Sequence, residues 1–196
     1  MKNFDLSFIS NEIKLIAGVD EVGRGPLAGP VVAAAVIFDN DTFIPGINDS
    51  KKVSEKNREL LFDIIKEKAI SYGIGIIDES EIDQINILQA SLKAMKIAIE
   101  QLSVKPDLIL IDGNKSFITD IPTQTIIKGD SKSFSIAAGS ILAKVTRDRM
   151  MVKLAEKHPE YSWEKNKGYG TRVHIKSIKE HGATSYHRKS FLGNIL

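Results

Sequence analysis

Three short apolar segments of this chain each run into an aspartate. Residues 14–19 precede Asp20, residues 108–111 precede Asp112, and residues 123–127 reach Asp130 through a lysine and a glycine. Apolar runs of this length are typical of buried β-strands. In open α/β sheets ligands bind beyond the carboxyl ends of the strands, so parallel neighbours would gather these acids at one edge. Glu21 would add a fourth carboxylate there.

The remaining pattern predicts an α/β fold with a five-stranded mixed sheet flanked by helices, because strands come first and then alternate with helices. Residues 31–38 and 72–77 complete the strands. Helices are expected over 54–69, 80–102 and 134–157, and another after Thr171. We expect one domain over residues 1–196, whose helical, basic C-terminal segment starts near residue 158.

Several details of the helices can be predicted as well. Ser80 and Asp83 resemble a capping box, and the small residues near the start of helix 134–157 would let it press against the sheet. The positions expected to be buried are Leu60, Leu61, Ile64 and Ile65 in the first helix, and Leu88, Leu92, Met95, Ile99 and Leu102 in the second.

Carboxylates that share a site repel one another unless a cation is present. Mg²⁺ and Mn²⁺ take oxygen ligands, and a pair of such ions can activate water and stabilise the leaving oxygen of a phosphodiester. The alternative is that each acid caps a helix or faces solvent, which is the better explanation for any one of them alone. Because a glycine-rich turn directly follows Asp20 and Glu21, we favour a functional site.

The turn at residues 23–30 contains three glycines and two prolines. Gly23 and Gly25 permit unusual backbone angles and let a ligand approach the main chain, and Arg24 offers a planar cation to phosphate. A dinucleotide-binding loop is excluded because the third glycine is misplaced and a strand follows. A Walker loop is excluded because no Gly-Lys-Ser/Thr is in register. A plain hairpin turn is the remaining alternative.

The charge is unevenly distributed. From residue 164 to 196 there are seven Lys or Arg residues and two Glu residues, so this segment carries +5 while the whole chain carries +2. A basic segment beside clustered acids suits an anionic polymer, although a solvated basic helix face is an equal alternative. No apolar run is long enough to cross a bilayer, no secretory signal is recognisable, and there is no cysteine. We therefore expect a cytoplasmic protein.

Six segments, in this order, resemble the motifs of type 2 ribonuclease H (ribonuclease HII), and the resemblance covers about residues 16–191. They are DEVGRGPLAGPV at 20–31, NDSKK at 48–52, DG at 112–113, GD at 129–130, SIAAGSILAKVTRD at 135–148, and KGYGT at 167–171.

The resemblance implies an RNase H-like fold, hydrolysis of the RNA strand of RNA/DNA hybrids, and incision 5′ of single ribonucleotides in duplex DNA. It makes Asp20, Glu21, Asp112 and Asp130 the catalytic acids that bind two Mn²⁺ or Mg²⁺ ions. The substrate-binding residues would be Gly23, Arg24 and Gly25, which read the ribose 2′-OH, together with Tyr169 on the sugar and Lys144 and Lys51 on phosphate.

Other functions and roles are compatible with parts of the sequence. A nuclease acting on DNA alone, a catalytically silent hybrid-binding module and a small-molecule phosphatase are the competing functions. Trp163 is expected to pack in the interior, His174 to help cap a helix, and His187 to contact backbone or phosphate. A monomer is expected, and no tail that would bind a sliding clamp is recognisable.

Overall fold

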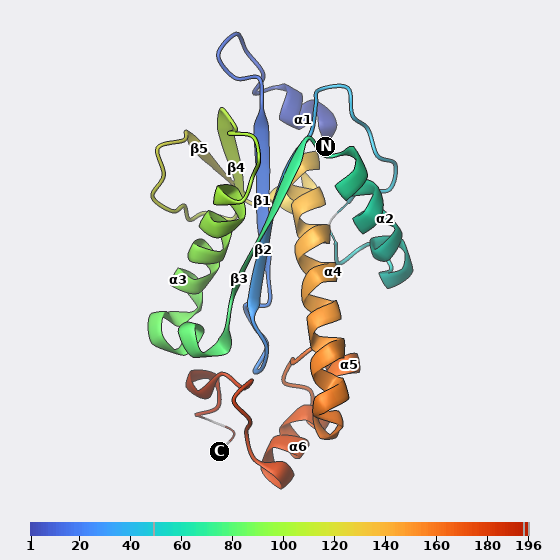
Figure 1. Ribbon diagram of the computed structural model, residues 1–196, viewed down its shortest axis with the longest axis vertical. Helices are drawn as coiled ribbons and strands as arrows, with labels where there is room; N and C mark the ends of the chain where they lie inside the picture. Colours follow the sequence, from blue (N-terminus) through green and yellow to red (C-terminus); the bar gives the residue numbers. More distant parts are fainter. Residues whose placement is uncertain (49, 194, 196) are drawn as a thin grey trace.

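A five-stranded mixed sheet forms the centre of the fold (Figure 1). The strand order is β3-β2-β1-β4-β5, in which β1, β2 and β3 pair antiparallel while β4 and β5 continue parallel to β1. The predicted α/β fold is confirmed. The computed structural model describes residues 1–48, 50–193 and 195, so Asp49 of the 48–52 segment lies outside the described residues. The strands are β1 (Ile16–Val22), β2 (Val31–Ile37), β3 (Ser71–Ile77), β4 (Leu108–Asp112) and β5 (Thr123–Ile126).

Helices cover both faces of the sheet, which explains why β2 is apolar at every position. Val32, Ala34 and Val36 face the long helix α4 (Phe134–Lys157), while the alternate residues face α3 (Glu79–Glu100). Gly139 brings α4 close to the sheet, because a Cβ at this position would stand 2.7 Å from the Ala34 carbonyl oxygen. The small residues at the start of α4 are buried as predicted.

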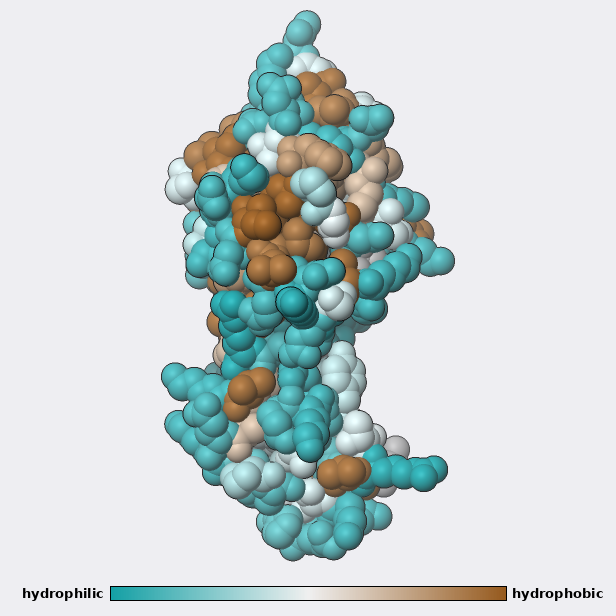
Figure 2. Space-filling model, turned by 90° about the vertical axis from the view of Figure 1, so that its right-hand side faces the viewer, coloured by the Kyte–Doolittle hydropathy of each residue, from teal (hydrophilic) through white to brown (hydrophobic). Residues whose placement is uncertain are grey.

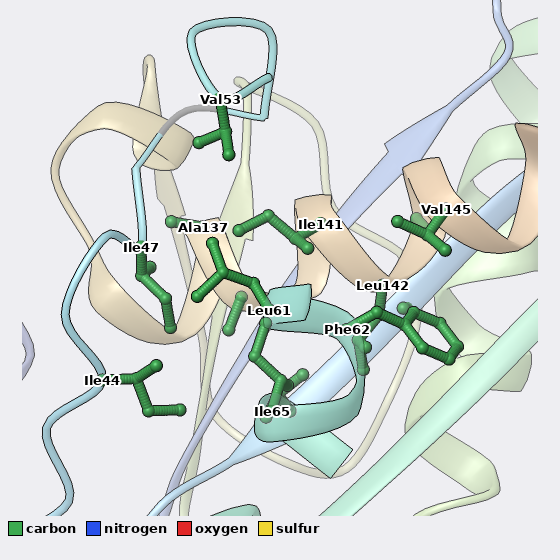
Figure 3. Close-up of a cluster of buried hydrophobic side chains, with 14 of the residues drawn as sticks. Ile44, Ile47, Val53, Leu61, Phe62, Ile65, Ala137, Ile141, Leu142 and Val145 are labelled. Carbon is green, nitrogen blue, oxygen red and sulfur yellow. The ribbon is translucent and has the colours of Figure 1, made fainter. Parts of the chain in front are cut away.

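Helix α2 (Glu55–Lys68) packs on α4 rather than on the sheet, and Figure 3 shows the side chains that join them. Leu61, Phe62 and Ile65 of α2 point toward Ile141, Leu142 and Val145 of α4. Ile47 and Val53 belong to the same cluster. The loop that carries Ser50 and Lys51 lies between Ile47 and Val53. Because Ile47 and Val53 are buried, both ends of this loop are held against the core.

Two predicted details of the helices are wrong. Leu60 is 58% and Ile64 36% exposed, because only one edge of α2 meets the core and Phe62 occupies it instead. The cap of α3 is Asp78, whose carboxylate accepts from the Glu81 N–H at 2.8 Å. Asp83, expected in a capping box, instead accepts hydrogen bonds from Lys189 and Ser190.

The buried stripe of α3 also differs in part from the prediction. Met95 and Ile99 are buried, but Leu88, Leu92 and Leu102 are only half-buried. Three alanines at positions 90, 94 and 98 occupy the closest approach to the sheet. They do so because β3 presents Gly73 and Gly75 there, and a Cβ on Gly75 would stand 1.9 Å from the Ala94 carbonyl oxygen.

The C-terminal segment forms a separate lower part of the molecule beyond the end of the sheet (Figure 1). The molecule narrows between the sheet and the C-terminal segment, and the surface of this narrow region is mostly hydrophilic on the face shown in Figure 2. No helix among the described residues is long and apolar enough to span a membrane. The remaining elements are α1 (Lys2–Leu6), η1 (Gly129–Ser131), η2 (Pro159–Tyr161), α5 (Trp163–Asn166), α6 (Arg172–His181) and η3 (Lys189–Phe191).

Candidate active site

The sheet brings Asp20 and Asp112 side by side. Val19 of β1 is in register with Ile111 of β4, and the next residue in each parallel strand is the aspartate. The strand β1 does not end before the acids, as the sequence suggested, but continues through Asp20 and Glu21 to Val22. Because successive side chains of a strand point to opposite faces, Asp20 lies on the α4 side and Glu21 on the α3 side.

Asp20, Glu21 and Asp112 line one cavity of about 390 Å³. The glycine turn, the 50–51 loop, α4 and the C-terminal part complete its walls, so segments far apart in the sequence meet there. All of the predicted substrate-binding residues are among its lining. They are Gly23, Arg24, Gly25, Lys51, Lys144 and Tyr169.

Asp130 lies in a different element from the other three acids, which belong to β1 and β4. It lies half-buried in the short helix η1, which follows Lys128 in a left-handed conformation, and it does not line that cavity. Its neighbour Gly129 donates its N–H to the Asp112 Oδ1 at 2.6 Å, so η1 is attached to the end of β4. Asp130 therefore lies next to the cavity, and its role as a metal ligand stays a prediction.

Burial makes the charged forms of Asp20 and Glu21 unfavourable in the metal-free protein. The pKa of Asp20 is raised well above its usual value, first by burial and then by repulsion from Glu21 and Asp112. The Ser140 hydroxyl and the Glu21 N–H, at 2.7 Å from Oδ1, oppose this shift. The pKa of Glu21 is also raised by burial, with opposition from Arg24. A cation in the cavity would relieve this repulsion.

The carboxylate oxygens of the cavity are suitable ligands for hard cations, but they do not form a complete metal site by themselves. Among the described residues, no three His, Asp or Glu side chains are grouped so as to hold an ion by themselves. Mg²⁺ is commonly bound by one or two carboxylates together with water and substrate phosphates rather than by the protein alone. The shared cavity of Asp20, Glu21 and Asp112 fits that kind of site.

Two of the positively charged side chains of the site, Arg24 and Lys144, already form ion pairs in the absence of substrate. The Arg24 Nη1 is 3.2 Å from the Glu21 Oε1, and the Lys144 Nζ is 2.7 Å from the Asp148 Oδ1. Arg24, Glu21 and Lys144 line the cavity, and about half of the Arg24 side chain is exposed. A phosphate would therefore have to compete with Glu21 and Asp148 for these groups.

Sequence reasoning missed the two serines of the site. Ser140 donates toward Asp20 and lies 2.9 Å from the Ser50 hydroxyl, so a chain of hydroxyl groups supports the buried carboxylate. A signal was available in the sequence. Ser140, Lys144 and Asp148 recur every four residues and therefore share one face of α4.

A pair of buried histidines, His174 and His187, supports the main chain at Tyr169. The Trp163 Nε1–H donates to the His174 Nε2 at 3.0 Å, and the His187 Nε2, 3.1 Å away, donates to the same atom. These contacts leave the His174 Nδ1–H to donate to the Tyr169 carbonyl oxygen at 2.9 Å. The pattern fixes both rings as neutral, since the His187 Nδ1 accepts from the Thr184 N–H.

The network shows what the C-terminal histidines do. Trp163 is fully buried, as predicted. The His174 side chain does not cap α6, because the Thr171 hydroxyl accepts from the His174 backbone N–H instead. The His187 ring contacts the Thr184 backbone, the first of its two predicted partners, and lies buried.

We expect this network to make the C-terminal part sensitive to acid. Burial, and then repulsion from His174 and His158, lowers the pKa of His187 to about 4, and burial also lowers the pKa of His174. The unfolded chain takes up these protons near pH 6.5. The stabilisation is therefore complete above about pH 6.5 and is lost as the pH falls toward 4, by up to roughly 1.4 kcal/mol per pH unit for one histidine.

The measurement is the urea midpoint between pH 7 and 4.5, followed by fluorescence of Trp163, the only tryptophan. His187→Gln should flatten this dependence, whereas His181→Gln, at an exposed position of α6, should leave it as in the unchanged protein. The same slope in all three proteins would show that other groups cause the acid sensitivity.

Comparison with known proteins shows the family of the chain. The sequence model of the family described as Ribonuclease HII matches residues 17–193. The chain belongs to the ribonuclease HII family. A ribonuclease HII of Acetivibrio thermocellus is 56% identical over 93% of this chain and 72% of its own length, and one of Geobacillus is 53% identical over 97% and 69%. The crystal structure of the ribonuclease H2 from Pyrococcus horikoshii, 27% identical, superposes with a TM-score of 0.75 over 90% of this chain and 93% of that one.

Membership of the ribonuclease HII family establishes the class of reaction. The chain is a metal-dependent nuclease with ribonuclease H activity, which hydrolyses the RNA strand of RNA/DNA hybrids. The predicted RNase H-like fold is confirmed by the same comparison.

Proposed function

We propose that this ribonuclease HII also incises duplex DNA on the 5′ side of a single embedded ribonucleotide, leaving 3′-hydroxyl and 5′-phosphate ends. The observation that carries the proposal is the shared cavity. Three acidic side chains, the main chain of the glycine turn and the Tyr169 ring meet in it. Hydrolysis and recognition of one ribose can therefore take place at the same nucleotide.

Asp20, Glu21, Asp112 and Asp130 are the proposed ligands of two Mn²⁺ or Mg²⁺ ions. When bound, such ions activate the attacking water and stabilise the leaving oxygen. The chain supplies the carboxylates, and Ser140 and the Glu21 N–H hold Asp20 in place for them. Lys144 and Lys51, which also line the cavity, are proposed to bind the phosphates on either side of the cleaved bond.

Gly25 and Tyr169 are proposed to enclose the sugar that carries the 2′-OH. A Cβ on Gly25 would meet nothing nearer than the Tyr169 Cε1, at 3.7 Å, so the main chain at Gly25 lies open beneath the ring. Tyr169 is 43% exposed at the mouth of the cavity. The 2′-OH distinguishes RNA from DNA, and an open main chain can approach it closely.

The test is a cleavage assay on a DNA duplex that contains one ribonucleotide, with Mg²⁺ or Mn²⁺ and mapping of the product ends. We expect one cut, 5′ of the ribonucleotide. Equal cutting of an all-DNA duplex would instead support a nuclease for DNA alone, and binding without cutting would support a silent hybrid-binding module. Affinity should fall steeply with added salt if backbone phosphates are bound, which a small-molecule phosphatase would not show.

We expect Tyr169→Ala to lower cleavage at a single ribonucleotide roughly tenfold, because a misplaced sugar loses its alignment with the acids. Binding to a long RNA/DNA hybrid should fall less, since many phosphate contacts remain. Single-turnover cleavage and hybrid affinity are the two measurements. Tyr169→Phe keeps the ring and serves as the matched control. Equal losses of cleavage and binding would mean that Tyr169 has only a structural part.

A further inference from the structure

Two arginines are buried behind the glycine turn. Arg147 of α4 and Arg188 before η3 are both 0% exposed. Neither takes part in an ion pair among the described residues. All their side-chain hydrogen bonds in this part of the chain go to main-chain carbonyl oxygens. Burying an unpaired cation is costly, so these two side chains call for an explanation beyond packing.

Arg147 joins the glycine turn to the segment that carries Tyr169. Its Nε donates to the Pro30 carbonyl oxygen at 2.8 Å and its Nη2 to that of Ala28 at 3.0 Å. Its Nη1 donates to the Lys167 carbonyl oxygen at 2.8 Å, two residues before Tyr169. One guanidinium group therefore sets the distance between the turn and the ring above it.

Arg188 binds the glycine turn at other carbonyl groups than Arg147 does. Its Nη2 donates to the carbonyl oxygens of Gly23 at 2.6 Å and Gly29 at 2.7 Å, and its Nη1 to that of Arg24 at 3.2 Å. Its Nε also donates to Gly29, at 2.9 Å. Its own N–H donates to the Leu27 carbonyl oxygen at 2.8 Å, so the backbone of the C-terminal segment is attached as well.

The direction of these carbonyl groups decides where the amides of the turn point. In a planar trans peptide the C=O of one residue and the N–H of the next point in opposite directions. Because Arg188 holds the C=O groups of Gly23 and Arg24, the N–H groups of Arg24 and Gly25 point away from it. All three residues line the cavity. Neither N–H has a hydrogen-bond partner among the described residues.

We propose that Arg188 and Arg147 are positioning residues that aim the Arg24 and Gly25 amides at the ribose, and so set the discrimination between ribonucleotide and deoxyribonucleotide. An arginine suits this task because its planar group offers five donors in a fixed arrangement, which a lysine lacks. Their charges also lie behind the turn, where a bound phosphate would benefit from them. The proposal rests on the proposed function, since it concerns recognition in the same cavity.

The test compares Arg188→Lys and Arg147→Lys with Arg149→Lys, a matched change on the exposed face of α4, where Arg149 pairs with Glu59. The affinity for a duplex with one ribonucleotide and for the all-DNA duplex is measured with a chelator present, so that nothing is cleaved. Cleavage rates and Mn²⁺ affinity are then measured below the melting temperature of every variant. We expect Arg188→Lys to reduce the preference for the ribonucleotide about tenfold and kcat/KM about 100-fold, with Mn²⁺ affinity within about threefold of the unchanged protein.

The proposal would be overturned if Arg188→Lys and Arg147→Lys both fold and prefer the one-ribonucleotide duplex over the all-DNA duplex as strongly as Arg149→Lys does. Losses of both duplex affinities in equal proportion would also overturn it, because a merely structural role predicts that pattern. If one of the two lysine variants does not fold, the other is judged by the same two criteria. A wild-type protein that shows no preference for the ribonucleotide would refute the proposed function itself, and this is seen before any variant is compared.

Discussion

Asp20→Asn is expected to abolish most of the activity and to stabilise the metal-free protein. Turnover should fall by more than roughly 100-fold, because even partners outside the metal ligands cost about 10–100-fold when removed. Stability should rise because Asp20 is buried beside Glu21 and Asp112, which disfavour its charge. The asparagine oxygen can still accept from the Ser140 hydroxyl and the Glu21 N–H. For a chain of this size each kcal/mol gained raises Tm by about 2–4 °C.

The measurements are cleavage of the one-ribonucleotide duplex and thermal unfolding with and without Mn²⁺. Asp120→Asn, at an exposed position between β4 and β5, is the matched control and should change neither. The added metal should stabilise the unchanged protein more than the Asp20 variant, since binding to the folded state raises Tm. Unchanged turnover in Asp20→Asn would refute the assignment of this acid.

Gly23→Ala is expected to lower both stability and cleavage, whereas Gly25→Ala is expected to lower cleavage alone, although the two glycines are only two residues apart. Gly23 has φ +96°, and a Cβ there would stand 2.3 Å from the Arg147 Nε and 2.8 Å from the Pro30 carbonyl oxygen. Left-handed strain and overpacking together cost a few kcal/mol, so Tm should fall on the order of 10 °C and cleavage should be lost with it.

Gly25→Ala should instead leave Tm nearly unchanged, within about 0.5 kcal/mol. Its φ is ordinary, and the added methyl group makes only van der Waals contact with the Tyr169 ring. That methyl group would occupy the place proposed for the sugar, so kcat/KM should fall at least roughly tenfold. Thermal unfolding and single-turnover cleavage separate the two variants. Equal loss of stability in both would mean that Gly25 serves the fold rather than the substrate.

Much of this protein could be predicted from its sequence because the signals are local. Short runs rich in apolar and β-branched residues predicted all five strands, and the caps Ser54 and Thr171 lie at the predicted starts of α2 and α6. The acids were found because they lie at or near the ends of strands. The motif that begins at Asp20 indicated the family, which the comparisons confirm.

Tertiary structure decided what depends on neighbours that are distant in the chain. Which leucines of α2 are exposed follows from α2 packing on α4 rather than on the sheet. Asp83 does not form the expected capping box because its carboxylate accepts from two backbone N–H groups of the C-terminal segment instead. The sequence placed glycines at 23 and 25, but only the position of Arg147 shows that the first lacks room for a side chain. A local pattern specifies elements, whereas burial and hydrogen-bond partners arise only when separate segments pack together.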